Sequence, residues 1–269
     1  MENFPLPTKI EIKKAKDDSK QFIIEPLYPG YGNTIGNALR RVLLSSLSGA
    51  AVTAVKIKGV EHEFSTIKNV KEDVISIILN LKQINFKYSS PEPVKLILKE
   101  KGEKKVKAGD IKATADIEIS NKNQVIANLT DKEAELEMEL TVERGRGYKP
   151  VESREEEEVQ IGNIRIDAIY TPIKNVNFHV ENVRVGEITN FDRLILDIKT
   201  DGTLTGEQAL KQAAELLVKH FNFVKGLQST EKKDKTKKVE NEKDQKNQPK
   251  EEEKKKITKE KSITTPEKK

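Results

Sequence analysis

The stretch YGNTIGNALRRVLLSSLSG, residues 31–49, decides how this chain is organised. Asn33 or Thr34 can cap the start of a helix, and Ser48-Gly49 can end it. At 100° per residue, one stripe of this helix is formed by Ile35, Ala38, Leu39, Val42, Leu43 and Ser46. The spacing therefore predicts an amphipathic helix whose apolar stripe packs on a core.

Arg41 and Leu44 lie opposite that stripe, on the polar face of the predicted helix. A large apolar residue beside an arginine, away from the core, is typical of a protein–protein contact. Single exposed leucines are also common on protein surfaces. The pattern alone leaves both interpretations open.

The composition excludes several classes of protein. The chain has 269 residues and no cysteine, which rules out disulfides and thiolate chemistry and is compatible with the cytosol. It contains no run of eighteen apolar residues and no signal-peptide hydrophobic region, so we expect a soluble protein that stays inside the cell.

The net charge of +5 belongs to the C-terminal segment. Residues 228–269 contain 15 lysines and 10 acidic residues, so the rest of the chain is electrically balanced. Apart from Val239, Ile257 and Ile263 the segment has no large apolar residue, and we expect a disordered tail. Its lysines alternate with glutamates, which favours a solubilising tail over a nucleic-acid-binding one.

The remaining pattern alternates between strands and helices. A second amphipathic helix is predicted from Val70 to Lys82, and a third begins with the capping box Thr205-x-x-Gln208 and ends near Gly226. An acidic loop is expected at 151–158. Strands are predicted around 10–12, 22–24, 51–60, 94–98, 115–119, 134–142, 159–170, 176–185 and 193–200.

The third helix is apolar on more than one side. Its main stripe contains Ala209, Leu210, Ala213, Ala214, Leu217, Phe221 and Val224, while other apolar residues lie outside it, namely Leu216, Val218 and Phe223. Such a helix needs more than one covering surface, for which its own sheet and a partner subunit are the natural choices.

No catalytic or metal-binding constellation is recognisable. The three histidines, His62, His179 and His220, lie in unrelated contexts, and zinc-type spacing is absent. Glycines at 30, 32 and 36 precede a helix as in a phosphate-binding loop, but the spacing fits a strand-to-helix turn better. We expect neither an active site nor a cofactor in this chain.

The sequence of the first predicted helix resembles that of a known family. Glu25-Pro26-Leu27 followed by residues 30–46 is similar to the signature helix of the bacterial-type RNA polymerase alpha subunit. Further matching blocks occur in the family's order: GVEHEFST at 59–66, VKED at 70–73, LNLK at 79–82, LTD at 129–131, VERGRGY at 142–148, DAxYxP at 167–172, NVRV at 182–185 and TxGT at 200–203. The resemblance extends from about residue 6 to residue 226.

The resemblance implies an α+β fold with two domains. A discontinuous dimerisation domain, made of a sheet and two long helices, would comprise 1–49 and 173–227. A mostly-β α+β domain would be inserted at 50–172, and the disordered tail would occupy 228–269. The pattern agrees, because two strongly apolar helices bracket a mostly β middle.

The resemblance also implies a function. The chain would be a non-catalytic subunit of a DNA-directed RNA polymerase, a nucleotidyltransferase. Its homodimer would be the platform on which the β and β′ subunits assemble for transcription, with omega and sigma in the holoenzyme. One protomer would hold β and the other β′, and DNA would be met only through the complex, in the cytoplasm near the nucleoid or in a plastid, away from membranes.

Particular residues acquire expected roles from the resemblance. The β contact corresponds to Arg41 and Leu44, the pair singled out by the helical pattern. Lys82, Ile166 and Arg184 match positions implicated in assembly with the large subunits, although Ile166 is usually valine in the family. The dimer interface is expected in the first and last helices, at Ile35, Leu39, Val42, Leu43, Leu210, Ala213, Leu217 and Phe221.

The chain departs from the family at its C-terminus. Family members commonly end in a second, helical domain that binds upstream promoter DNA and activators. A lysine/glutamate tail stands there in this sequence, either through truncation or because its lineage or organelle dispenses with the domain. The resemblance therefore does not carry promoter recognition or activator contact over to this chain.

Two other classes of function are left open. The first is a free-standing nucleic-acid-binding protein that uses the basic tail and the Arg144-Gly-Arg-Gly sequence. The second is a phosphate-using enzyme at the turn formed by residues 30–36. The electrical balance of residues 1–227 argues against the first, and the glycine spacing argues against the second.

Overall fold

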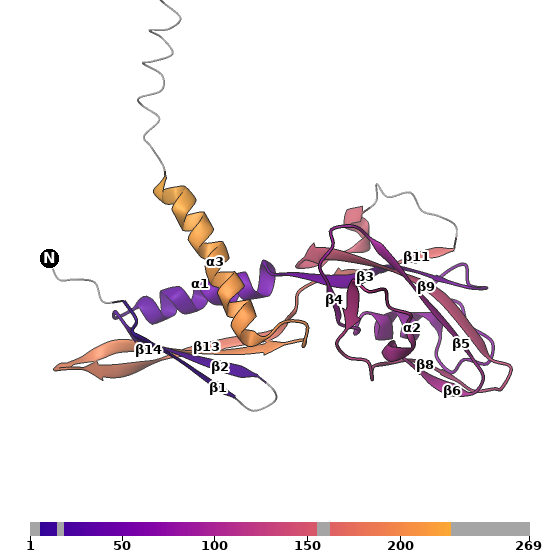
Figure 1. Ribbon diagram of the computed structural model, residues 1–269, viewed down its shortest axis with the longest axis horizontal. Helices are drawn as coiled ribbons and strands as arrows, with labels where there is room; N and C mark the ends of the chain where they lie inside the picture. Colours follow the sequence, from indigo (N-terminus) through magenta and orange to yellow (C-terminus); the bar gives the residue numbers. More distant parts are fainter. Residues whose placement is uncertain (1–5, 15–18, 155–161, 227–269) are drawn as a thin grey trace, which may run out of the picture. The chain divides into compact units, whose positions relative to one another are not determined.

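The computed structural model describes residues 6–14, 19–154 and 162–226 (Figure 1). The chain divides into two units, one ending at Val218 and the other beginning at Lys219. The predicted tail and part of the predicted acidic loop lie outside the described residues. The described residues combine β-sheets with three α-helices, which confirms the predicted α+β class.

A four-stranded antiparallel sheet joins segments from the two ends of the sequence. Its strands lie in the order β1-β2-β14-β13. Pairing of β2 with β14 places Phe22 opposite Leu196. The strand bounds are β1 Lys9–Lys14, β2 Lys20–Leu27, β13 Ile173–Val185 and β14 Ile188–Thr200.

Two helices contribute to the core on one face of this sheet (Figure 1). These helices are α1, Tyr31–Ser45, and α3, Gly206–Lys225. Their small and branched apolar residues pack against the sheet because they recur with helical spacing. The buried residues of this core are Phe22, Leu39, Leu43, Leu47, Ile173, Val176, Leu196, Ile198, Ala209 and Ala213.

The middle of the chain builds a second set of sheets. A larger sheet has the order β5-β9-β3-β4-β7, with β11 paired to β3, and two-stranded sheets are formed by β6 with β8 and by β10 with β12. The α-helix that the structure describes in this segment is α2, Val74–Leu81. The strands are β3 Ser48–Ile57, β4 Phe86–Tyr88, β5 Val94–Lys101, β6 Lys104–Lys107, β7 Ile117–Ile119, β8 Val125–Leu129, β9 Glu135–Arg146, β10 Tyr148–Lys149, β11 Asn163–Arg165 and β12 Ala168–Ile169.

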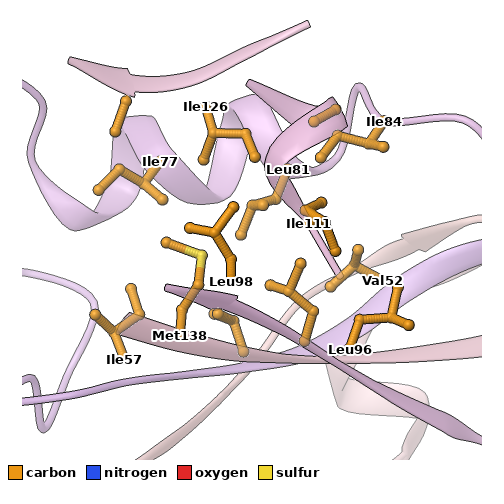
Figure 2. Close-up of a cluster of buried hydrophobic side chains, with 14 of the residues drawn as sticks. Val52, Ile57, Ile77, Leu81, Ile84, Leu96, Leu98, Ile111, Ile126 and Met138 are labelled. Carbon is orange, nitrogen blue, oxygen red and sulfur yellow. The ribbon is translucent and has the colours of Figure 1, made fainter. Parts of the chain in front are cut away.

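The middle segment has its own hydrophobic core. Figure 2 shows Ile77 and Leu81 of α2 gathered with apolar side chains from the surrounding strands. The strands supply inward residues at every second position, as half-buried strands do. Their labelled contributors include Val52, Ile57, Leu96, Leu98, Ile126 and Met138.

The ends of α1 differ from the prediction. Its N-cap is Gly30, whose φ of 86° is left-handed, so the cap predicted at Asn33 or Thr34 is wrong. The helix ends at Ser45. Ser48-Gly49 does not end it, because Ser48 already pairs with Arg146 at the start of β3.

The other two helices begin at local capping signals. In α3, Thr205 and Gln208 exchange hydrogen bonds of 3.1 and 3.2 Å between side chains and backbone N–H groups, which confirms the capping box. In α2, the Asp73 carboxylate accepts the N–H of Ser76 at 2.9 Å. Val70, which the prediction included in this helix, instead precedes it and forms a β-bridge with Leu129.

A close junction lies where α1 leads into β3. Gly49 pairs with Gly145 across the β3–β9 ladder. A Cβ on Gly145 would lie 2.5 Å from the ring of Tyr170, and a Cβ on Gly49 would overlap the Tyr170 carbonyl oxygen. Tyr170 is only 3% exposed, so its ring and backbone occupy the space that side chains at both glycines would need.

Candidate functional site

The N-terminus of α1 is bound by a carboxylate of the protein itself. Oδ2 of Asp192, in β14, accepts the N–H groups of Gly30 and Gly32, each at 2.9 Å. A Cβ on Gly32 would lie 2.8–2.9 Å from Val180 and Asp192, which explains the glycine. The donors that a phosphate would need at this turn therefore already serve Asp192, and the geometry favours a structural turn over a phosphate site.

Arg41 and Leu44 lie on the exposed face of α1, as the helical spacing predicts. Leu44 is 37% exposed. The Arg41 guanidinium has no hydrogen-bond or ion-pair partner among the described residues, although Ser45 Oγ donates to the Arg41 carbonyl at 2.7 Å. One surface of the helix thus offers an arginine fork next to an apolar side chain, a combination suited to binding a protein.

The residues predicted for a dimer interface fall into three groups. Leu39, Leu43 and Ala213 are buried in the core of the chain itself. Phe221 is 65% exposed. The remaining four are half-buried against the same core, namely Ile35, Val42, Leu210 and Leu217.

The last turns of α3 carry the most exposed apolar side chains of that helix. Besides Phe221, Val218 is 55% exposed, Phe223 is 80% exposed and Val224 is 57% exposed. A helix that is apolar on more than one side is typical of one that packs against a second surface as well as its own sheet.

Two isoleucines on β1 were missed by the sequence analysis. Ile10 and Ile12 are 62% and 50% exposed, yet they pair with Ile24 and Phe22 of β2. Directly paired residues share a face of a sheet, so both isoleucines extend the apolar face that carries the core. Their alternation in the sequence was the available signal.

Asp167 connects two residues of the predicted assembly group, because it follows Ile166 in the sequence and forms an ion pair with Lys82. Lys82 Nζ lies 3.3 Å from Asp167 Oδ2, and Oδ1 of Asp167 accepts the Val151 N–H at 3.0 Å. That N–H and, to a smaller extent, Lys82 hold the pKa of Asp167 below its usual value. Burial raises the pKa of nearby Tyr148, and the Asp167 charge adds to this effect.

The other members of the predicted assembly group lie in contrasting places. Ile166 is 2% exposed, whereas Arg184 is exposed near the β13–β14 turn, where its Nε donates to Gly186 O at 2.8 Å. Arg184 therefore belongs to the first sheet and is not part of the Lys82 cluster. Lys82 also lines a groove of about 460 Å³ whose polar lining includes Asn85, Asn121, Gln124, Lys174 and Asp201.

The Arg144-Gly-Arg-Gly sequence has a structural use. The Arg144 guanidinium donates to Ser89 O at 2.8 Å and to Ser48 Oγ at 3.1 Å.

Within the described part of the chain, no helix is both long and apolar enough to cross a membrane.

Comparison with known proteins identifies the family. The family model for the RNA polymerase Rpb3/RpoA insert domain matches residues 55–171. The DNA-directed RNA polymerase subunit alpha of Roseiflexus castenholzii is 51% identical over 216 residues, which cover 80% of this chain and 66% of the relative, slightly under two thirds.

Two other relatives are covered more completely. The subunit alpha of Moorella thermoacetica is 48% identical over 219 residues, 81% of this chain and 70% of the relative. That of Aquifex aeolicus is 46% identical over 228 residues, 84% of this chain and 72% of the relative. With identity this high over more than two thirds of these relatives, the chain belongs to the family of DNA-directed RNA polymerase alpha subunits.

Proposed function

We propose that this chain is the homodimeric platform on which the large β and β′ subunits of a DNA-directed RNA polymerase assemble. The observation that carries the proposal is the set of exposed apolar side chains on the last turns of α3, where Val218, Phe221 and Val224 share one side of the helix and Phe223 lies on the other. Four such side chains within seven residues are a large exposed apolar area for a subunit that works alone. In this role the chain supplies no catalytic residue and works in the bacterial cytoplasm at the chromosome.

A second copy of the chain is the occupant of this surface. Fully burying a phenylalanine or valine side chain stabilises an interface by roughly 1.5–3 kcal/mol each. In a two-fold dimer every contact occurs twice, so Val218, Phe221 and Val224 of each protomer, which share one side of the helix, would contribute six buried side chains. Ile10 and Ile12 are further exposed residues on the apolar face of the first sheet.

The buried residues of the predicted interface act as its support. Leu39, Leu43 and Ala213 place α1 and α3 on the sheet, while the half-buried and exposed residues of the two helices make the contact. This division agrees with a discontinuous dimerisation domain of 1–49 and 173–227. The matched insert-domain model at 55–171 supports the inserted domain proposed for 50–172.

Arg41 and Leu44 form the proposed contact with β. Their side chains leave the helix on the face away from the core, so β binding and dimerisation can use different sides of α1. The guanidinium can grip a carboxylate or backbone carbonyls while Leu44 fills an apolar pocket. Lys82 and Arg184 are exposed enough to contact a large subunit, at separate places on the chain.

Neither competing function is favoured by an observation. The basic tail lies outside the described residues, Arg144 is bound within the protein, and the amides of Gly30 and Gly32 serve Asp192. The partners omega and sigma belong to the proposal through the family alone.

Co-purification of β with the full-length dimer tests the proposal. Arg41→Ala should weaken β capture about thirtyfold, since truncating a central interface arginine typically costs about 2 kcal/mol. Arg40→Ala is the matched control, because Arg40 is the exposed neighbour on a different side of the helix. Full β occupancy with Arg41→Ala, or a monomeric wild type in light scattering, would contradict the proposal.

A further inference from the structure

A buried residue cannot touch a partner through its side chain. Ile166, which matches a position implicated in large-subunit assembly, is only 2% exposed. The side chain of Lys82 is 22% exposed and can reach a partner with its ammonium group. Ile166 must therefore act on the surface indirectly, through the residues that it holds in place.

The segment 148–154 forms a bracket over residues 165–167. The Val151 N–H donates to Asp167 Oδ1 at 3.0 Å, and the Arg165 guanidinium donates to Arg154 O at 3.0 Å. In the opposite direction, the Arg154 guanidinium donates to Ile166 O. Three hydrogen bonds therefore link this segment to the Arg165 side chain, the Ile166 carbonyl and the Asp167 carboxylate.

Arg154 is an unusual member of this bracket because its charge is buried. It is 9% exposed and has no ion-pair partner among the described residues, and its buried Nε has no hydrogen-bond partner there. Its guanidinium instead donates to Ile166 O and, at 3.5 Å, to Thr53 O. Thr53 O also accepts the Ile166 N–H at 2.8 Å. An arginine so placed ties β3 to the segment that carries Asp167.

The two carboxylate oxygens of Asp167 accept hydrogen bonds from different groups, one in the 148–154 segment and one on Lys82. Oδ1 accepts the Val151 N–H, and Oδ2 accepts Lys82 Nζ. A lysine ammonium has three N–H donors, of which Asp167 takes one, and two remain for a partner. A lysine tethered in this way loses less side-chain entropy on binding than a freely rotating one.

We infer that Asp167 and Arg154 are positioning residues that hold Lys82 in the orientation required by a large subunit. Ile166 contributes through its backbone and its packing, without touching the partner. On the large subunit, the acceptor for the two remaining N–H groups of Lys82 is a carboxylate or a pair of backbone carbonyls. This inference rests on the proposed function, because it specifies how one of its contacts is built.

The test compares Asp167→Asn with a matched control in the full-length dimer. Glu118→Gln is the control, because Glu118 pairs with Lys87 at the same distance of 3.3 Å but both side chains are far more exposed, at 65% and 59%. The Lys82 signal is followed by NMR after 13C-methylation of the lysines. Capture of the large subunits is measured by co-purification, with Lys82→Ala as the reference.

We expect Asp167→Asn to shift the Lys82 signal and to lower capture about fivefold or more, as Lys82→Ala does. The double variant Asp167→Asn/Lys82→Ala should lose little more capture than either single variant, because both substitutions disrupt the same Asp167–Lys82 pair. Val151→Pro provides a second route, since it deletes the N–H while leaving the carboxylate charge. Glu118→Gln should leave both measurements unchanged.

The outcomes separate the inference from the proposed function. An unchanged Lys82 signal in Asp167→Asn, or full capture by this variant while Lys82→Ala captures poorly, would overturn the positioning role and leave the proposed function standing. Failure of the wild-type dimer to capture any large subunit would instead refute the proposed function, and the inferred contact with it.

Discussion

Replacing Asp192 is expected to destabilise α1 from a strand far away in the sequence. The Asp192 carboxylate is 7% exposed and accepts two N–H groups at the start of α1, those of Gly30 and Gly32. The first N–H groups of a helix lack partners within it, and the positive end of the helix dipole favours an anion there. One carboxylate thus serves both needs.

The expected magnitude follows from these contacts. Asp192→Asn keeps one acceptor oxygen but loses the charge, and hydrogen bonds to charged groups are worth roughly 1 kcal/mol more than neutral ones. The Asn variant should therefore lose about 1–3 kcal/mol of unfolding free energy, including the dipole interaction. Asp192→Ala removes the oxygen that accepts both N–H groups. It should lose about 2–4 kcal/mol, with water replacing part of the bond to the amide of Gly30, which is exposed.

Urea unfolding followed by circular dichroism measures these losses. All variants must be compared at one protein concentration, because a dimer's apparent stability depends on it. Asp197→Asn is a control in the same strand, where a carboxylate oxygen accepts Gln21 Nε2 at 3.0 Å. If Asp192→Ala is no less stable than this control, the carboxylate does not hold the helix start and the reasoning fails.

Three further predictions concern other parts of the chain. Burial raises the pKa of Asp201, so its charge costs stability at neutral pH. Asp201→Asn, which keeps an acceptor for Thr203, should raise the melting temperature at pH 7, with the gain vanishing as pH falls toward 3.8. Gly49→Ala should lower the unfolding free energy by about 2 kcal/mol or more in urea titrations, because its Cβ would overlap Tyr170 O; wild-type stability would contradict the junction. Phe221→Asp should yield folded monomers in light scattering, and a persistent dimer would disprove its interface role.

Local signals in the sequence predicted the local structure well. The capping box at Thr205 and Gln208 needs only three residues of spacing, and both of its hydrogen bonds are present. The helical spacing likewise placed Arg41 and Leu44 on the exposed face of α1. Their binding partner is a separate matter, which stays a prediction.

Contacts between distant segments were beyond the reach of such signals. The start of α1 was predicted wrongly because its anion comes from Asp192, about 160 residues further along the chain. Whether Ile166 is buried depends on how Arg154 and β3 close around it, which no periodicity encodes.

The junction between Gly49, Gly145 and Tyr170 restricts how these three positions can vary among related sequences. A side chain at Gly145 conflicts with the Tyr170 ring, so a smaller residue at 170 would make room for alanine at 145. Gly49 conflicts with the backbone of Tyr170, which no substitution at 170 removes. Across relatives we therefore expect positions 145 and 170 to covary as a small–large pair, whereas position 49 remains glycine whatever its neighbours become.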